Sequence, residues 1–431
     1  MHPHSRILDS QTLVSMSALA QPAAPSSQPA PLGLATAAVA LCGVCAFLEL
    51  YCTQPLLPML AGIFHASKTG VGLTVSAATA GVAVSAPVFG ALTERLPRKR
   101  VIVCSLLGIS LPTLLAATAT SLAQLVFWRF LQGLTVPGVI AVLITYVGEE
   151  WPSHQIPLVM SFYVSGTALG GFLGRIVAGI LADHFSWRIS FVVLGLAALV
   201  GASGVALWLP AGRPRGTSQP SAGKLPAFPY QVQALFRRTR LVTTFIVGFN
   251  SLFSLVAVFT WITFHLAVAP YNLSVTALSS LFFVYLIGLV VTPVGGFLIT
   301  RVGLRAGITG AICLAISGVL LTLAPSLAVV VTGLALLCSG IFIAQTVNSS
   351  NLRHAAPAGT RVTAAGLYIT FYYLGGTAAG VVPGIFWNLG KWPACVAFIV
   401  CMELIALAVA LIGWRSTPET SSALEPRPLN P

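Results

Sequence analysis

The sequence is a succession of apolar segments, each long enough to cross a membrane. A helix needs about 20 apolar residues to cross a hydrocarbon core of roughly 30 Å. Because lipid offers no hydrogen-bond partners, each segment must satisfy its own backbone hydrogen bonds, as a helix does. Barrel strands would be about half as long and would alternate in polarity. The chain is therefore predicted to be an all-α membrane protein with twelve transmembrane helices, near residues 33–58, 70–93, 100–120, 123–147, 157–182, 189–209, 241–267, 274–299, 304–324, 327–349, 362–388 and 393–414.

Composition excludes a soluble alternative. Hydrophobic residues make up 56% of the 431 residues and charged residues only 7%. So few charges leave too little polar surface to cover a soluble domain of this length.

A long polar stretch, residues 210–240, divides the twelve segments into six and six. The first 31 residues are rich in Ala, Pro, Ser and Gln, so they are expected to be disordered. We therefore expect a tail over 1–32, a first half over 33–209, a linker over 210–240, a second half over 241–414 and a tail over 415–431.

Basic residues are distributed unevenly between the two sides of the predicted bundle. With a cytoplasmic N-terminus, cytoplasmic tails and loops hold 17 Lys or Arg, and the opposite face holds only Lys68, Arg188 and Lys391. Cytoplasmic loops of membrane proteins carry such an excess. Both termini are therefore expected in the cytoplasm, and the net charge of +13 indicates topology rather than nucleic-acid binding.

Two pairs of short stretches recur between the halves. "GALTERLPRK" (90–99) matches "GFLITRVGLR" (296–305) at a glycine, a leucine and an arginine on the same spacing, and "YVSGTALGG" (163–171) matches "YLGGTAAGV" (373–381). The offsets, 206 and 210 residues, are nearly equal. Many secondary transporters are built from such repeats, with the substrate site between them near the membrane midplane.

On these residues the chain resembles the major facilitator superfamily. That family has Gly-x-Leu-x-Asp-Arg-x-Gly-Arg-Lys between helices two and three, and Arg-x-x-Gln-Gly in helix four. In "LYCTQPLLPML", "YVGEE", "GRIVAGILADHFSWR" and "YYLGG" it resembles, more narrowly, the bacterial inner-membrane group called YnfM-like. The residues that match the two signatures are Gly90, Leu92, Glu94, Arg95, Arg98 and Lys99, with Pro97 replacing a glycine, and Arg129, Gln132 and Gly133.

The resemblance implies the major facilitator fold and a gate at the loop between helices two and three. In the family the acid at the position of Glu94 docks toward helix eleven and helps to hold the cytoplasmic side shut. The second copy has Thr300 there, so the gate is expected to be asymmetric. We also expect Glu149 or Glu150 to pair with Arg98 or Lys99. The gating candidates are Gly90, Glu94, Arg95, Arg98, Lys99, Glu149, Glu150, Arg301 and Arg305.

Four charged residues fall inside predicted spans: Glu49, Arg129, Arg175 and Glu403. Such charges usually face the bundle interior and have partners. Glu403 is expected in a structural pairing or at the lipid edge. The first three are the proton-coupling candidates, and Arg175 is equally compatible with a structural role.

Glu49 is the proton carrier we favour. This inference comes from the position of its carboxyl group deep in the first span, not from the resemblance to the family. Burial favours the neutral form of carboxyl groups, and a cationic substrate would expel the proton. The alternative is a fixed ion pair with Arg129 or Arg175.

Further polar residues at membrane depth predict a mildly polar, aromatic cavity. Each alone is equally compatible with an interhelical hydrogen bond. As a set they favour amphipathic or cationic compounds. The substrate-cavity candidates are Tyr51, Gln54, Gln132, Asn250, Gln345, Asn348, Tyr372 and Tyr373.

The sequence lacks the motifs of an ATP-driven transporter, a metal-binding protein or an enzyme. The sequence has no phosphate-binding loop for ATP, no His or Cys spacing typical of a metal site, and no cluster of nucleophile and base. We therefore expect no enzyme activity, no catalytic residue, no cofactor and no metal. The expected partners are a small-molecule substrate, protons and the lipid bilayer, and the chain is expected to act as a monomer.

The sequence thus predicts a secondary transporter of small organic compounds in a bacterial inner membrane, a proton-coupled exporter that works by alternating access. Two alternatives stay open at this point. Proton-coupled uptake would use the same residues. A non-transporting membrane sensor would need neither the paired loops nor an intramembrane acid.

Overall fold

The computed structural model describes residues 32–92, 96–212, 228–357 and 360–414, and in these it has helices and no strand. In the first half, the first span consists of three pieces, and five long helices follow. They are α2 (Leu32–Leu48), η1 (Gln54–Leu56) and α3 (Leu57–Ile63), then α4 (Lys68–Leu92), α5 (Arg98–Ala116), α6 (Leu122–Glu150), α7 (Ile156–His184) and α8 (Trp187–Trp208).

The second half repeats this arrangement. A backbone break at Gly303 divides α12 between two spans, and one at Gly390 and Lys391 divides α15 between the end of the eleventh span and the twelfth. The elements are α9 (Phe228–Phe236), α10 (Thr239–Leu266), α11 (Val275–Ser280), η2 (Leu281–Leu286), α12 (Ile287–Leu321), α13 (Leu327–Ala355), α14 (Arg361–Val381) and α15 (Pro383–Gly413).

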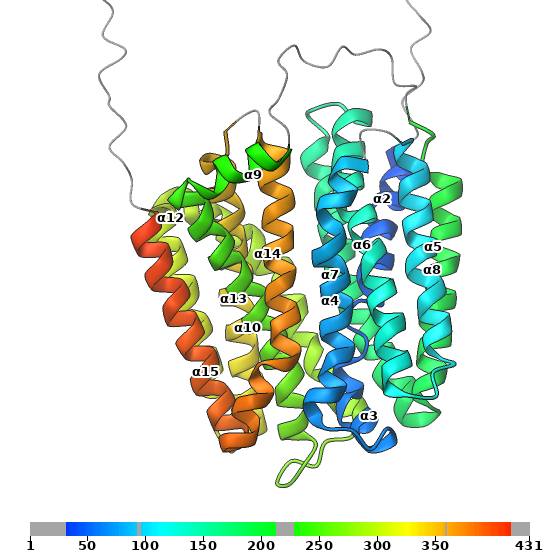
Figure 1. Ribbon diagram of the computed structural model, residues 1–431, viewed down its shortest axis with the longest axis vertical. Helices are drawn as coiled ribbons and strands as arrows, with labels where there is room; N and C mark the ends of the chain where they lie inside the picture. Colours follow the sequence, from blue (N-terminus) through cyan, green and yellow to red (C-terminus); the bar gives the residue numbers. More distant parts are fainter. Residues whose placement is uncertain (1–31, 93–95, 213–227, 358–359, 415–431) are drawn as a thin grey trace, which may run out of the picture.

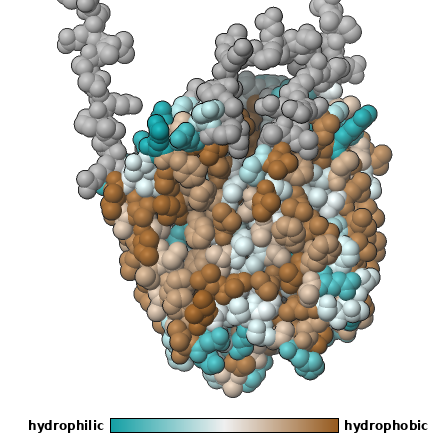
Figure 2. Space-filling view, viewed as in Figure 1, coloured by the Kyte–Doolittle hydropathy of each residue, from teal (hydrophilic) through white to brown (hydrophobic). Residues whose placement is uncertain are grey.

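Ten helical segments in the described part are long and apolar enough to cross a membrane. The first span, made of α2, η1 and α3, and the eleventh, made of α14 and the start of α15, complete the twelve that the sequence predicts. The two halves stand side by side (Figure 1), and hydrophobic residues cover much of the visible flank (Figure 2).

Two elements differ from the expectation. The first span is interrupted at residues 49–53, because Pro55 has no backbone N–H to continue the helix. The expected linker, 210–240, contains the helix α9, whose Leu235 is buried and whose Phe236 ring packs on Phe245 and Phe371.

Glycines allow close packing within each half. A side chain on Gly166, Gly170 or Gly174 of α7 would collide with the backbone of α2. One on Gly375 of α14 would likewise collide with the backbone of α10 at Phe249. The pairs α2–α7 and α10–α14 are equivalent in the two halves, and such close approach is typical of membrane helices.

The contacts between the halves lie toward one end of the bundle. We call the end at Gly212 and Phe228 the linker end and the opposite end the far end; in Figure 1 the label α9 lies at the linker end and the label α3 at the far end. The polar and ring contacts described between the halves lie between the far end and the middle of their helices. These contacts include Lys68 with Phe264 and Trp387, Ser76 and Thr79 with Thr377, and Asp183 with Thr276.

Candidate functional site

The break in the first span places polar side chains on two sides of one short segment. Glu49 faces the interior of the first half, and Tyr51 and Gln54 face the second half. Two groups of side chains result. We call Glu49, Thr113, Arg129 and Gln132 the Glu49 network, and Tyr51, Arg175, Phe282 and Tyr285 the Arg175 box.

Arg129 binds backbone carbonyl groups of the broken segment and of α4. Its Nη1 donates to the carbonyl of Glu49 at 2.7 Å and its Nε to the carbonyl of Thr74 at 3.1 Å. Further bonds reach the carbonyl of Leu50 and the side-chain oxygen of Gln132. Buried carbonyls need partners in lipid, so Arg129 fastens the broken span to α4 and α6 and does not line the space between the halves.

Glu49 is fully buried, and its partners are neutral. Its Oε2 accepts from the hydroxyl of Thr113 at 2.6 Å and from the amide of Gln132 at 3.1 Å. Its Oε1 has no hydrogen-bond partner among the described residues. In that part of the chain the only ion pair joins Arg98 and Glu149, so the alternative of a fixed ion pair between Glu49 and either buried arginine is not formed.

Arg175 lies where the two halves meet. Its guanidinium carbon is 4.8 Å from the ring centroid of Tyr51 in the first half, and 4.8 Å and 4.5 Å from those of Phe282 and Tyr285 in the second. Its hydrogen bonds go to Gln54 at 2.8 Å and to the carbonyl of Gly171. The charge is thus surrounded by aromatic faces and neutral acceptors from both halves.

Gln54 continues this contact into the second half. Its amide donates to the hydroxyl of Thr260 at 3.2 Å. The two residues are 206 positions apart, which equals one of the two offsets, 206 and 210, between the repeated stretches. Nearly equivalent positions of the two halves therefore touch each other beside Arg175.

The other cavity candidates occupy several places. Tyr372 is half-buried and packs on Tyr368 and Tyr373. Asn348 donates to the carbonyl of Thr244 and to the hydroxyl of Tyr368, and these are interhelical hydrogen bonds, the alternative to a cavity role. Gln345 is half-buried on α13, and Asn250 is buried on α10 and faces Glu403.

Glu403 is buried, which excludes the lipid-edge placement considered for it. It faces Asn250 and Ser254 of α10. These contacts join α15 to α10 within the second half.

The gating candidates gather at the linker end. Glu94 and Arg95 lie outside the described residues, and Gly90 lies in the last turns of α4. Glu149 forms the expected ion pair with Arg98. Glu150 lies beside Gly212, and Lys99 is half-buried in the first turn of α5. In the second half, Arg301 lies over the ring of Phe297 and Arg305 donates to the carbonyl of Leu411.

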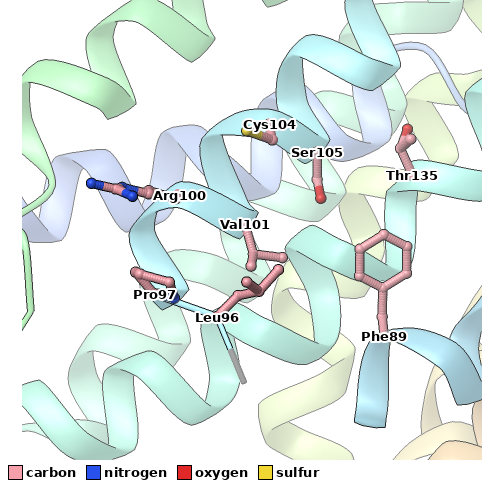
Figure 3. Close-up of a pocket in the computed structure, with 8 residues that line it drawn as sticks. All are labelled: Phe89, Leu96, Pro97, Arg100, Val101, Cys104, Ser105 and Thr135. Carbon is pink, nitrogen blue, oxygen red and sulfur yellow. The ribbon is translucent and has the colours of Figure 1, made fainter. Parts of the chain in front are cut away.

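A cavity of about 400 Å³ lies inside the first half, beside Leu96 and Pro97, which precede α5. Its walls come from α4, α5 and α6, and Figure 3 shows Phe89, Val101 and Leu96 grouped together while the guanidinium of Arg100 points away from them. None of the predicted cavity residues lines it. Elsewhere in the described residues, no three His, Cys, Asp or Glu side chains gather as around a metal ion.

The sequence interpretation missed three residues of these groups, Thr113, Phe282 and Tyr285, and also Thr260, the partner of Gln54. Thr260 stands at the repeat offset from Gln54, a signal that could have identified it. Phe282 and Tyr285 stand in an apolar run, "LFFVYL", where aromatic residues are ordinary. Thr113 follows Pro112 in α5 and carries no comparable signal.

Comparison with known proteins decides the family. The Major Facilitator Superfamily matches residues 39–380 of this chain. The chain belongs to this superfamily. The inner membrane transport protein YnfM of Escherichia coli K12 is 32% identical over 381 residues, which cover 87% of this chain and 89% of that protein. The uncharacterized transporter YybF of Bacillus subtilis is 32% identical, covering 84% of this chain and 88% of that one.

Solved structures agree on the fold. A bacterial homologue of the human lysosomal transporter Spinster, in an inward-facing and unoccupied conformation, superposes with a TM-score of 0.74 at 16% identity, over 88% of this chain and 96% of that chain. The nucleoside transporter NupG superposes with a TM-score of 0.72 at 12% identity, over 88% of this chain and all of that one. This superfamily member is thus a multi-pass membrane transporter.

Proposed function

We propose that this transporter couples proton movement to the export of small organic compounds, by rocking its two halves about a site between them. The observation that carries the proposal is the set of contacts that join the halves toward the far end, among them Gln54 with Thr260, Ser76 with Thr377 and Asp183 with Thr276. Closure at the far end is a feature of one of the two states that alternating access requires.

Glu49 is the proposed proton carrier. The hydroxyl of Thr113 can donate to a carboxylate or accept from a carboxylic acid, and Oε1 lacks a partner, so the site suits either form. Hydrogen bonds lead from Glu49 through Gln132 and Arg129 to the carbonyl of Leu50 in the broken segment. Gln54, at the end of the same segment, bonds to Thr260 of the second half.

The basic residues support an orientation with the linker end in the cytoplasm. Among the described loops and helix ends, the far end carries Lys68, Arg188 and Lys391. The linker end carries many more, as cytoplasmic faces do. They are Arg98, Lys99, Arg100, Arg237, Arg238, Arg240, Arg301, Arg305, Arg353 and Arg361.

The test of proton coupling is a flux assay with Glu49→Gln in proteoliposomes. A pH-sensitive dye in the lumen reports proton movement when organic anions, cations and neutral compounds are added one by one. We expect the wild type to move protons with at least one of these compounds, and Glu49→Gln to lose that flux while retaining exchange of the compound. Glu403→Gln, a buried acid of the other half, serves as the matched control and should keep the flux.

Three results would contradict the proposal. The wild type could move no protons with any compound, or Glu49→Gln could move them at the wild-type rate. Equal loss in Glu49→Gln and Glu403→Gln would show that the effect is not specific to Glu49.

The direction of transport has its own test. Cells that lack an exporter should become sensitive to its toxic substrates, because these accumulate. Cells that lack an uptake system should instead be protected, or starve for a nutrient. Protection across a panel of toxic compounds would favour proton-coupled uptake over the export proposed here.

A further inference from the structure

We infer that the Arg175 box binds the carboxylate of an organic anion with an aromatic or apolar body. This inference rests on the proposed transport function and names its substrate class. It reverses the cationic preference that the sequence suggested, because the buried acid faces the interior of one half while the buried cation faces the junction of both.

The two buried arginines differ in how far their hydrogen bonding is satisfied. Each guanidinium has five N–H donors. Arg129 uses its three nitrogens on three backbone carbonyls and the Gln132 side chain. Arg175 has acceptors for two donors within the described part of the chain, so three stay available.

The charge of Arg175 is also uncompensated. Its side chain is 2% exposed, and no carboxylate in the described chain lies within 4.0 Å of it. A buried charge without a counter-ion is unfavourable, and aromatic faces offset only part of this. A carboxylate would supply the missing charge and would accept two N–H bonds at once from the guanidinium.

A second donor lies in the same place. Tyr285 is buried, its ring lies 4.5 Å from the guanidinium carbon, and its hydroxyl has no hydrogen-bond partner in the described chain. A phenol hydroxyl can donate to a carboxylate oxygen. The ring that lies over the guanidinium of Arg175 thus also carries a neutral donor without a partner in the described chain.

The box is built from both halves, which relates it to transport. Arg175 and Tyr51 belong to the first half, and Phe282 and Tyr285 to the second. When the halves separate at the far end, the guanidinium loses two of its three rings and is uncovered. Opening at the far end thus changes the surroundings of the guanidinium, and with them the stability of a bound carboxylate.

The aromatic walls define the rest of the ligand. Phe283 packs on Phe172 across the same junction, so the surroundings are apolar as well as aromatic. A ring or alkyl body beside the carboxylate would keep these faces dry. Small hydrophilic anions would leave them in contact with water.

Equilibrium binding to the purified full-length protein tests the inference. The probes are benzoate, phenylacetate and hexanoate, each paired with its neutral amide, and the readout is thermal stabilisation as a function of probe concentration. We expect at least one acid to stabilise the wild type and its amide to have no comparable effect. Arg175→Gln should lower the affinity by about tenfold or more, whereas Arg353→Gln, which removes an exposed arginine, should not change it.

Two conservative variants keep the test decisive if Arg175→Gln fails to fold. Arg175→Lys keeps the charge but loses the planar pair of donors, and Tyr285→Phe keeps the ring but loses the hydroxyl. Both should fold and bind the acid several-fold more weakly. Equal stabilisation by acids and amides, no stabilisation by any acid, or unchanged affinity in all three variants would overturn the inference. Because binding needs no pH gradient, these outcomes are independent of proton coupling.

Discussion

Arg129 and Arg175 are both buried arginines, and their surroundings give them different roles. Arg129 holds the carbonyls of a broken helix, and Arg175 joins two halves that must separate. The sequence could place both arginines inside membrane spans, because each lies within a long apolar segment. It could not assign their partners, because those belong to helices far apart in the chain.

Arg129→Gln is expected to destabilise the protein. Three buried carbonyl groups would lose a charged donor, and the carbonyl of Leu50 has no other partner described, so it would be left as an unsatisfied buried group, which costs about 1–3 kcal/mol. Arg175→Gln removes a charge that lacks a counter-ion and should cost much less. Thermal unfolding in the same detergent compares the two. A melting temperature of Arg129→Gln equal to that of the wild type would contradict the structural role given to this residue.

At the scale of elements, hydrophobic length predicted all twelve spans, but not where they break or how they dock. The interruption of the first span follows from Pro55, yet prolines stand inside several other helices, such as Pro87 in α4 and Pro137 in α6, without ending them. What differs in the first span is that Arg129 donates hydrogen bonds to backbone carbonyls of the interrupted segment. That compensation is tertiary and cannot be seen in the local sequence.

The contact between α4 and α14 leads to a prediction about closure of the far end. A side chain on Gly72 would collide with the carbonyl of Gly380 in the other half. Gly72→Val should therefore leave each half folded and hold the far end open. A membrane-impermeant thiol reagent should then label a cysteine placed at Thr69 faster than in the wild type. Gly62→Val, where the new side chain meets open space, is the matched control.

Faster labelling in both glycine variants would indicate general loosening. Unchanged labelling in Gly72→Val would show that the halves close without this contact. Either result would contradict the role given to the glycine pair.

At the scale of the whole molecule, the repeat in the sequence predicted two equivalent halves, and the structure shows where they touch. Gln54 and Thr260, 206 residues apart, are bonded to each other beside Arg175. The sequence favoured cationic substrates because Glu49 was expected to face the cavity between the halves. The break in the first span turns Glu49 toward Thr113 and Gln132 of its own half instead, and residue type and depth in the membrane do not reveal this.

The central claim is that the two halves open at alternate ends, and paired distances measure this most directly. Spin labels at Ala123 and Ser326 report the far end, and labels at Ser153 and His354 report the linker end; all four positions are exposed. The exposed cysteines Cys104, Cys313 and Cys401 are first replaced by serine. Lowering the pH, or adding a carboxylate that binds, should lengthen one distance and shorten the other in the same sample. Two distances that stay fixed, or that change in the same direction, would contradict the account.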